Sequence, residues 1–207
     1  MKLLFATRSK GKQREIRRLL DTLGLEVVFP DDLGVVEEPA EASLELHDSF
    51  EANARAKAEY FARRTGLPTV ADDSGLEVLS LGGEPGVRSK RWAGASGPDE
   101  LVDQANNAHL LHRLAGATGL RRRARYRCVL ALFRHRNAVP EIFIGSATGS
   151  ITTEPAGTGG FGYDPYFLSD ALEKTFAEAT EEEKDRASHR GEACRALLAA
   201  LAPSPDS

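Results

Sequence analysis

The chain alternates between two patterns of apolar and polar residues, one typical of helices and one typical of strands. Apolar residues recur at helical spacing in 16–23, 50–61 and 194–201, and Tyr126, Cys128, Leu130 and Leu132 stand on alternate positions, as in a long strand. Short apolar runs predict buried strands at 3–6, 26–29 and 68–71. Further strands are expected at 125–133, 141–147, Ile151 and 166–168, and helices at 49–65, 98–114 and 191–201. The succession predicts an α/β fold with a mixed sheet.

Residues at the ends of these segments fit the same assignment. Gly24 and Gly66 are suited to cap helices, and Thr180 with Glu183 forms the capping-box pattern of a helix start. The acidic stretch 31–47 has no regular pattern, so we expect an irregular segment there. Asp72-Asp73-Ser74-Gly75 would then stand at the exit of the strand 68–71.

The length of the chain and the absence of repeats and linkers in its sequence indicate the domain organisation. The 207 residues contain no internal repeat and no linker rich enough to separate independent domains. We expect one domain over 1–202, with two lobes on a shared core, followed by a flexible tail at 203–207.

Composition narrows the class of protein. Apolar residues make up 41% of the chain and the formal net charge is -4, which argues against a protein that holds nucleic acid by bulk positive charge. Basic clusters at 88–91 and 121–125 nevertheless keep a nucleic-acid-binding module as an alternative from a different class.

The two cysteines and the N-terminal residues indicate the cellular compartment that we expect. Cys128 and Cys194 are far apart, lack CxxC spacing and lie in apolar patterns, so we expect two buried thiols in a reducing compartment. The first residues turn polar too early for a signal peptide, and no apolar run reaches membrane-spanning length. The expectation is a cytoplasmic protein with no membrane partner.

The first candidate site is the polar turn between the first strand and the first helix. It reads Thr7-Arg8-Ser9-Lys10-Gly11-Lys12. Backbone amides at a helix N-terminus, together with the lysines, suit a phosphate chain. The spaced glycines of a Walker A loop are missing, and a solvated basic helix start is the alternative.

The second candidate is Asp72-Asp73-Ser74-Gly75. Carboxylates where a strand ends stand where α/β proteins usually place their chemistry, and their hard oxygens suit Mg²⁺. An acidic β-turn is the alternative, because the same residue types favour turns.

Two later segments carry the remaining candidates. The loop 157–164 has four glycines in eight residues, interleaved with Phe161 and Tyr163, so its backbone can approach a ligand while the rings offer stacking faces. A tight structural loop is the alternative. Lys184, His189 and Arg190 gather hydrogen-bond donors, although alone they would fit a solvated basic face.

Taken in order, these segments resemble one family. They are Phe5-Ala6-Thr7, Lys12, Ala71-Asp72-Asp73-Ser74-Gly75-Leu76, Gly159-Gly160-Phe161-Gly162-Tyr163-Asp164-Pro165, Glu183-Lys184 and Ser188-His189-Arg190-Gly191. The set is similar to the inosine triphosphate pyrophosphatase (ITPase) family, also called dITP/XTP pyrophosphatases. The resemblance covers about residues 3–201, and the ordered set is more specific than any one motif.

The resemblance implies a fold, an assembly and a division of roles. The fold would be two α/β lobes around a long mixed sheet with flanking helices, the active site would lie in the cleft between the lobes, and the protein would be a homodimer. Asp73 would be the general base and a Mg²⁺ ligand, with Glu45 as the other metal carboxylate. Substrate contacts would come from Thr7, Arg8, Ser9, Lys10, Gly11, Lys12, Lys57, Asp72, Ser74, Phe161, Gly162, Tyr163, Asp164, Lys184, His189 and Arg190.

Two positions depart from the family pattern. Ser9 stands where asparagine is usual, so a phosphate contact there would be shorter or bridged by water. His47 stands where glycine is common, which leaves Glu41 as a rival to Glu45 for the metal.

The implied reaction converts ITP, dITP or XTP into the monophosphate and pyrophosphate. Water would attack the α-phosphorus, Asp73 would take its proton, and Lys10 and Lys12 would stabilise the leaving pyrophosphate. Lys184 and Arg190 are obligate donors, which suits the 6-keto group of hypoxanthine and xanthine. A Maf-like pyrophosphatase acting on modified pyrimidines is the enzymatic alternative.

Overall fold

The computed structural model describes residues 2–21 and 25–202. Its strands are β1 (Lys2–Phe5), β2 (Glu26–Val28), β3 (Thr69–Val78), β4 (Arg123–Phe133), β5 (Glu141–Ile151) and β6 (Phe167–Ser169). Its α-helices are α1 (Lys10–Leu20), α2 (Phe50–Thr65), α3 (Asp99–Arg113), α4 (Glu181–Ala187) and α5 (His189–Leu201). The expected Gly24 cap and the tail 203–207 lie outside the described residues.

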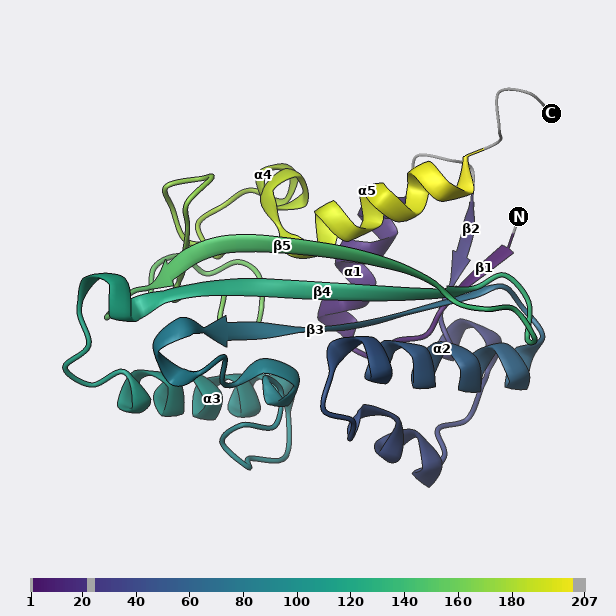
Figure 1. The fold of residues 1–207 in the computed structure, drawn as a ribbon, viewed down its shortest axis with the longest axis horizontal. Coiled ribbons are helices and arrows are strands. Elements are labelled where there is room, and N and C mark those ends of the chain that lie inside the picture. Colours follow the sequence, from purple (N-terminus) through teal and green to yellow (C-terminus); the bar gives the residue numbers. More distant parts are fainter. Residues whose placement is uncertain (1, 22–24, 203–207) are drawn as a thin grey trace. The chain divides into compact units, whose positions relative to one another are not determined.

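The strands form one six-stranded mixed sheet in the order β2-β1-β3-β4-β5-β6 (Figure 1). β1 pairs in parallel with β2 and with β3, where Leu4 faces Thr69 and Phe5 faces Val70. β6 pairs antiparallel with β5, with Ile151 opposite Phe167. The expected α/β class with a mixed sheet and flanking helices is confirmed.

Contacts divide the chain into two compact units. Unit 1 contains the described residues of Met1–Asp73, Cys128–Gly145 and Gly191–Ser207. Unit 2 contains Ser74–Arg127 and Ser146–Arg190. The chain passes from one unit to the other within β3, β4 and β5 and at the start of α5, and the first of these passages lies between Asp73 and Ser74.

The core of unit 1 joins both ends of the chain. Ile16 and Leu20 of α1 pack in one cluster with Cys194 and Leu197 of α5 and with apolar residues of β1, β3 and β4. In Figure 1, α5 and α2 lie on opposite sides of the strands. Both cysteines are buried free thiols, as the sequence predicts.

Helix α2 is the element that the sequence predicts best. Ser49 caps its start by accepting from the Ala52 amide at 3.1 Å. Gly66 ends it with a φ of 72°, a conformation that favours glycine. The helix buries the expected Phe50, Ala54, Ala58 and Phe61, and also two polar residues, Asn53 and Lys57.

The core of unit 2 is built around aromatic rings. Tyr126 of β4 packs against Phe167 and Phe176, with ring centroids 4.7 and 5.9 Å away. Leu110 of α3 belongs to the same cluster. Thr180 and Glu183 form the predicted capping box at the start of α4.

Two expected strand ends are wrong. β3 does not end before Asp72 but continues through Asp73 and Ser74 to Val78. The strand tolerates these buried carboxylates because each has a polar partner from another element. β5 likewise runs through Gly149, where a Cβ would lie 2.3 Å from the Leu168 carbonyl oxygen. That glycine allows β6 to approach closely, and it does not end the strand.

The acidic stretch after β2 is more regular than expected. It contains two short 3₁₀ helices, Asp31–Leu33 and Pro39–Glu45. Among the described residues, no helix has both the length and the apolar character needed to cross a membrane.

Candidate functional site

Each unit contains its own group of polar residues that are buried or half-buried. In unit 1, Glu45, Asp72 and Asp73 form what we call the carboxylate cluster, accompanied by Lys12 and Lys57. In unit 2, Lys184, His189 and Arg190 form what we call the donor cluster, close to the loop 157–164. All of these residues are among the site candidates that the sequence predicts.

Asp72 is held by a cation from the phosphate-binding candidate. It is fully buried on β3, and Lys12 Nζ lies 2.8 Å from its Oδ2 atom. Lys12 reaches it from the first turn of α1. The structure therefore joins the turn 7–12 to the acidic segment of β3 directly, through a charged pair that is largely shielded from solvent.

Asp73, the next residue of β3, is held differently. The side-chain amide of Asn53 on α2 donates to Asp73 Oδ2 at 2.8 Å. Burial raises the pKa of Asp73 above its usual range, although Lys57, Lys12 and the Asn53 hydrogen bond favour the charged form. A carboxyl with a raised pKa is a better proton acceptor than an ordinary aspartate.

Glu45 joins the cluster from the end of the 3₁₀ helix Pro39–Glu45. Lys57 Nζ lies 2.6 Å from Glu45 Oε1, and this positive charge lowers the pKa of Glu45 despite burial. Burial alone would lower the pKa of Lys57, but the charges of Glu45, Asp73 and Asp72 raise it above its usual value. Lys57 is therefore a fully charged cation within the carboxylate cluster.

The carboxylate cluster suits a hard divalent cation in its chemistry. Asp73 and Glu45 interact electrostatically and offer oxygen ligands of the kind that Mg²⁺ takes, with water and phosphate completing its shell. Within residues 2–21 and 25–202, no group of three or more acidic, histidine or cysteine side chains is arranged so that it could hold a metal ion by itself. A site of two carboxylates fits Mg²⁺ better than it fits a metal that requires an all-protein shell.

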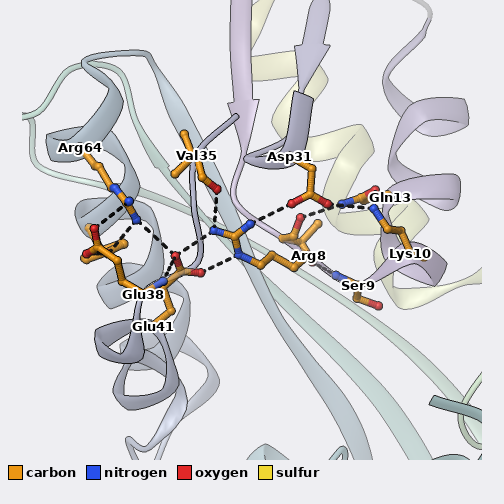
Figure 2. Close-up of polar contacts among 11 residues, drawn as sticks. Arg8, Ser9, Lys10, Gln13, Asp31, Val35, Glu38, Glu41 and Arg64 are labelled. Carbon is orange, nitrogen blue, oxygen red and sulfur yellow. Dashed lines mark hydrogen bonds and ion pairs between the residues drawn. The ribbon is translucent and has the colours of Figure 1, made fainter. Parts of the chain in front are cut away.

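The rival metal carboxylate, Glu41, has other partners. Both of its oxygens accept from Arg8, at 2.7 and 2.9 Å, and Arg64 lies 3.4 Å away (Figure 2). This fork engages the whole carboxylate. Glu45, which shares its electrostatic environment with Asp72 and Asp73, is therefore the better placed of the two.

The turn 7–12 is held by a hydrogen bond of its own and by contacts with neighbouring segments. The Ser9 amide donates to Thr7 Oγ1 at 3.3 Å, and Gln13 Nε2 donates to the Thr7 carbonyl at 3.1 Å. Ser9 is the N-cap residue of α1, yet its side chain makes no capping hydrogen bond. Lys10 pairs with Asp31 at 2.8 Å, and its side chain remains 70% exposed. Gly11 is the second residue of α1.

In unit 2, Asp164 folds the glycine-rich loop onto itself. Its Oδ2 atom accepts from the Phe161 amide at 2.8 Å. Gly160 has a φ of 71°, and a Cβ there would lie 2.1 Å from that same oxygen. A larger residue at this position would therefore break the loop.

Two members of the donor cluster lie over the Phe161 ring, and the third stacks on Tyr126. Lys184 Nζ lies 2.5 Å from Asp164 Oδ2 and 5.1 Å from the centre of the Phe161 ring. Arg190 lies 5.7 Å from that ring and donates to Ser74 Oγ at 2.9 Å. His189 stacks on Tyr126, with ring centroids 4.6 Å apart and planes at 6°.

The solvated-face interpretation of these donors is wrong. Lys184, His189 and Arg190 are only 6%, 4% and 2% exposed. Burying two cations is costly unless they have partners, and here the partners include a carboxylate, a hydroxyl and aromatic rings. Such an arrangement is typical of a binding site, where buried donors are held ready for a ligand.

Tyr163 serves a different purpose from its neighbour Phe161. Its ring belongs to the core of unit 2, and its hydroxyl donates to the Ser89 carbonyl at 2.8 Å. Burial raises the pKa of Tyr163 above its usual value. Of the two rings expected to offer stacking faces, only that of Phe161 lies outside the fully buried core.

Several residues beside the candidates escaped sequence reasoning. Asn53 donates to Asp73, and Tyr126 stacks on His189. Asp103 accepts from the Gly162 amide at 2.8 Å, and Asn107 donates to the Gly162 carbonyl at 2.9 Å, so α3 holds both sides of this glycine. The four-residue spacing of Asp103 and Asn107, which places them on one face of a helix, was the only available signal.

The basic clusters of unit 2 are largely used inside the unit. Arg123 pairs with Asp170 and Arg125 with Glu77. Lys90 lies 2.9 Å from Asp103, and Arg122 donates to the carbonyls of Ile151 and Thr152. This pairing argues against a nucleic-acid-binding role for the clusters, because phosphate contacts need available cations.

The fold and the two groups of residues define an α/β enzyme with the groups needed to act on an anionic substrate. A family comparison is more specific. The sequence model of the Ham1 family matches residues 3–200, and the chain belongs to this family.

Individual relatives and structures agree. The chain is 45% identical to the dITP/XTP pyrophosphatase of Escherichia coli K12 and 46% identical to that of Shigella flexneri, each over 97% of this chain and 98% of the relative. A HAM1 protein from Coxiella burnetii has a similar structure, with a TM-score of 0.83 and 35% identity over 97% of this chain and 98% of that one. A nucleoside-triphosphatase / dITP/XTP pyrophosphatase from Mycobacterium abscessus has a TM-score of 0.71 and 42% identity over 99% of this chain and 100% of that one. The resemblance noted in the sequence is confirmed.

Proposed function

We propose that this protein hydrolyses the non-standard purine nucleoside triphosphates ITP, dITP and XTP to the monophosphate and pyrophosphate. The observation that carries this proposal is the environment of Asp73, a buried carboxyl with a raised pKa, fixed by Asn53 and accompanied by charged lysines. Membership of the Ham1 family and the names of its relatives support the substrate class.

Asp73 would act as the general base. A water molecule attacks the α-phosphorus, the bond from that phosphorus to the bridging oxygen of the β-phosphate breaks, and the water proton passes to Asp73. The pyrophosphate leaves with the electron pair of the broken bond. The raised pKa of Asp73 helps this step, since it brings the acceptor closer to neutral pH than an ordinary aspartate.

Asp73 and Glu45 would hold a magnesium ion. When bound, Mg²⁺ neutralises phosphate oxygens and orients the leaving group. Lys57 and Lys12 are paired with Glu45 and Asp72 in this structure. Because each lysine has three donors, both can keep a carboxylate contact and still offer a hydrogen bond to phosphate.

The triphosphate would lie along the turn 7–12. The amides at the start of α1 and the side chains of Thr7, Ser9, Lys10 and Lys12 supply donors, and backbone amides at a helix N-terminus favour anions. Because the Ser9 side chain makes no capping hydrogen bond, its hydroxyl can face a phosphate directly or through water.

The purine would be held by unit 2. Phe161 offers a ring for stacking, and the loop around Gly162 is fixed by Asp103 and Asn107. Lys184 and Arg190 provide donors that match a 6-keto oxygen, while adenine presents a donor at the same position. A site that hydrogen-bonds one group can reject the mismatched analogue by about 10⁴-fold.

We further propose a cytoplasmic homodimer that removes damaged purines from the nucleotide pool. The proposal rests on the family and on the buried thiols, which suit a reducing compartment. Light scattering after size-exclusion chromatography tests the assembly, and a single mass of about 22.4 kDa would contradict it.

One assay tests the reaction itself. Purified protein is incubated with ITP and Mg²⁺, and pyrophosphate and orthophosphate are measured separately, with Asp73→Asn as the matched control. We expect pyrophosphate and IMP from the wild type and a strongly reduced rate from the variant. Orthophosphate with accumulating IDP would contradict the proposal, and preferred cleavage of modified pyrimidine triphosphates would favour the Maf-like alternative.

A further inference from the structure

The guanidinium of Arg8 is almost completely occupied by protein partners. Its Nε and Nη2 atoms form a fork with both oxygens of Glu41, at 2.7 and 2.9 Å. Nη1 donates to Asp31 at 2.8 Å, and Nη2 also donates to the Val35 carbonyl at 3.1 Å (Figure 2). An arginine has five N–H donors, and these contacts use four. A phosphate could therefore take only one N–H group without displacing one of these partners.

The partner carboxylates lie on two segments of unit 1. Asp31 begins the 3₁₀ helix that follows β2, and Glu41 lies in the middle of the 3₁₀ helix Pro39–Glu45. Arg8 itself is in the turn between β1 and α1, so one side chain links three stretches of chain. Figure 2 shows Arg8 between Asp31 on one side and Glu41 on the other.

The segment that Arg8 binds also carries the proposed metal ligand. Glu45 is the last residue of the 3₁₀ helix that contains Glu41. A 3₁₀ helix this short has weak hydrogen bonds of its own, so its position depends on contacts with its neighbours. These contacts include Arg8 to Glu41, Arg64 to Glu38 at 2.8 Å, and Tyr60 to Glu38 at 2.8 Å.

The anchors act at opposite ends of this helix. Arg64 and Tyr60 of α2 hold Glu38 at its start, while Lys57 of α2 binds Glu45 at its end. Arg8 is the contact that ties the middle of the helix to the turn 7–12. Without Arg8, the remaining anchors of this 3₁₀ helix, Arg64, Tyr60 and Lys57, would all come from α2.

We propose that Arg8 is a positioning residue for the metal site, which acts through Glu41 to fix the segment that carries Glu45, and that it does not serve as a triphosphate ligand. The assignment deepens the proposed function, on which the role of Glu45 rests. It also replaces the substrate-binding role that the sequence predicts for Arg8.

The two roles predict different behaviour. If Arg8 positions Glu45 through Glu41, then removing either partner must weaken the binding of a divalent cation even when no nucleotide is present. If Arg8 instead binds phosphate, then removing it must raise the KM for ITP, and removing the charge of Glu41 must not reproduce that effect.

The test is a double-mutant cycle in which the affinity for Mn²⁺ is measured by electron paramagnetic resonance in the absence of nucleotide. Arg8→Ala and Glu41→Gln should each weaken Mn²⁺ affinity about tenfold, the scale for losing a residue that supports a metal ligand. The double variant should be no weaker than the weaker single variant, because both changes break one interaction. At saturating Mg²⁺, the KM for ITP should stay within about twofold of wild type in both single variants.

Two further variants serve as controls. Arg17→Ala removes an arginine of the same unit that pairs with Asp32, the neighbour of Asp31, and it should leave Mn²⁺ affinity unchanged. Arg8→Lys keeps the charge but loses the fork, so its affinity should lie between those of wild type and Arg8→Ala. This variant and Glu41→Gln keep the test decisive if Arg8→Ala does not fold, which its thermal unfolding midpoint would reveal.

Three results would overturn the inference. They are wild-type Mn²⁺ affinity in the folded Arg8 variants, additive losses in the double variant, or a raised KM in Arg8→Ala with normal kinetics in Glu41→Gln. The Mn²⁺ titration needs no nucleotide, so it can fail while ITP hydrolysis succeeds. Conversely, absence of pyrophosphate release by the wild type would refute the proposed function, but the Mn²⁺ affinities of the variants could still be compared.

Discussion

The side-chain amide of Asn53 donates to Asp73 Oδ2 at 2.8 Å, and both groups are buried. This bond connects α2 to β3 and fixes the direction of the carboxyl that we assign as general base. Asn53 also accepts from the His47 amide at 2.9 Å through its Oδ1 atom, so its orientation is set from both sides. Two neutral contacts thereby control one ionisable group.

The first prediction concerns Asp73 itself. Asp73→Asn should keep the fold and lower kcat at least about a hundredfold, the usual scale for losing a general base. Mg²⁺ should raise the unfolding temperature of the wild type but not that of the variant, because the variant lacks a metal carboxylate. A variant that retains more than about a third of wild-type kcat at saturating Mg²⁺ would show that Asp73 is not the base.

The same substitution has a pH-dependent effect on stability. The pKa of Asp73 is raised in the folded protein, so its favourable contribution to stability is present below its unfolded pKa and is lost as pH rises through the folded pKa. In metal-free buffer at pH 7, Asp73→Asn should therefore unfold at the same or a higher temperature than the wild type. That difference should shrink as the pH is lowered.

A second prediction uses Asn53. Asn53→Ala removes a hydrogen bond that favours the charged form of Asp73, so the pKa of Asp73 should rise further. Because the base must be ionised to act, the acid limb of the kcat profile should move to higher pH. Glu51→Ala, an exposed change on the same helix, is the control and should leave the limb in place. An unmoved limb in Asn53→Ala would separate this amide from the catalytic proton transfer.

Lys12 and Lys10 should differ in their importance. Lys12 is 16% exposed and paired with Asp72, whereas Lys10 is 70% exposed and paired with Asp31. Lys12→Ala should raise the KM for ITP and XTP by similar factors of about tenfold or more, because its charge acts on the triphosphate whichever base is attached. Lys10→Ala should have a smaller effect, since exposed charges are screened. A Lys12→Ala loss confined to one base would instead place Lys12 near the purine.

Base selection should depend on Lys184. Removing it alone would leave Asp164 buried without its cation, a change that costs about 3–5 kcal/mol, so the informative variant is Lys184→Met with Asp164→Asn. We expect this double variant to lose most of the preference for ITP over ATP in kcat/KM. Undiminished preference in the double variant would refute the role of Lys184 in recognising the 6-keto group.

Much of the fold was predictable because it depends on local patterns. The Ser49 and Gly66 caps, the capping box at Thr180 and the buried face of α2 are all set by residues a few positions apart. The positions of the candidate residues were predictable for a different reason, since they occur as an ordered set of motifs that a family shares.

What the sequence did not reveal depends on long-range pairing. The contact between Arg8 and Glu41, which is 33 residues away, is one such pairing. The sequence predicts Asp72-Asp73 at the exit of a strand because adjacent carboxylates rarely lie within a buried strand, and the partners Lys12 and Asn53 make that possible. Asp103 contacts Gly162 across 59 residues, a relationship that no local pattern records.

The central claim is that water attacks the α-phosphorus, and isotope labelling tests it most directly. ITP is hydrolysed by the wild-type protein in H₂¹⁸O with Mg²⁺, and both products are analysed by mass spectrometry. The account predicts one ¹⁸O atom in IMP and none in pyrophosphate. Label in the pyrophosphate, which requires attack at the β-phosphorus, would contradict it.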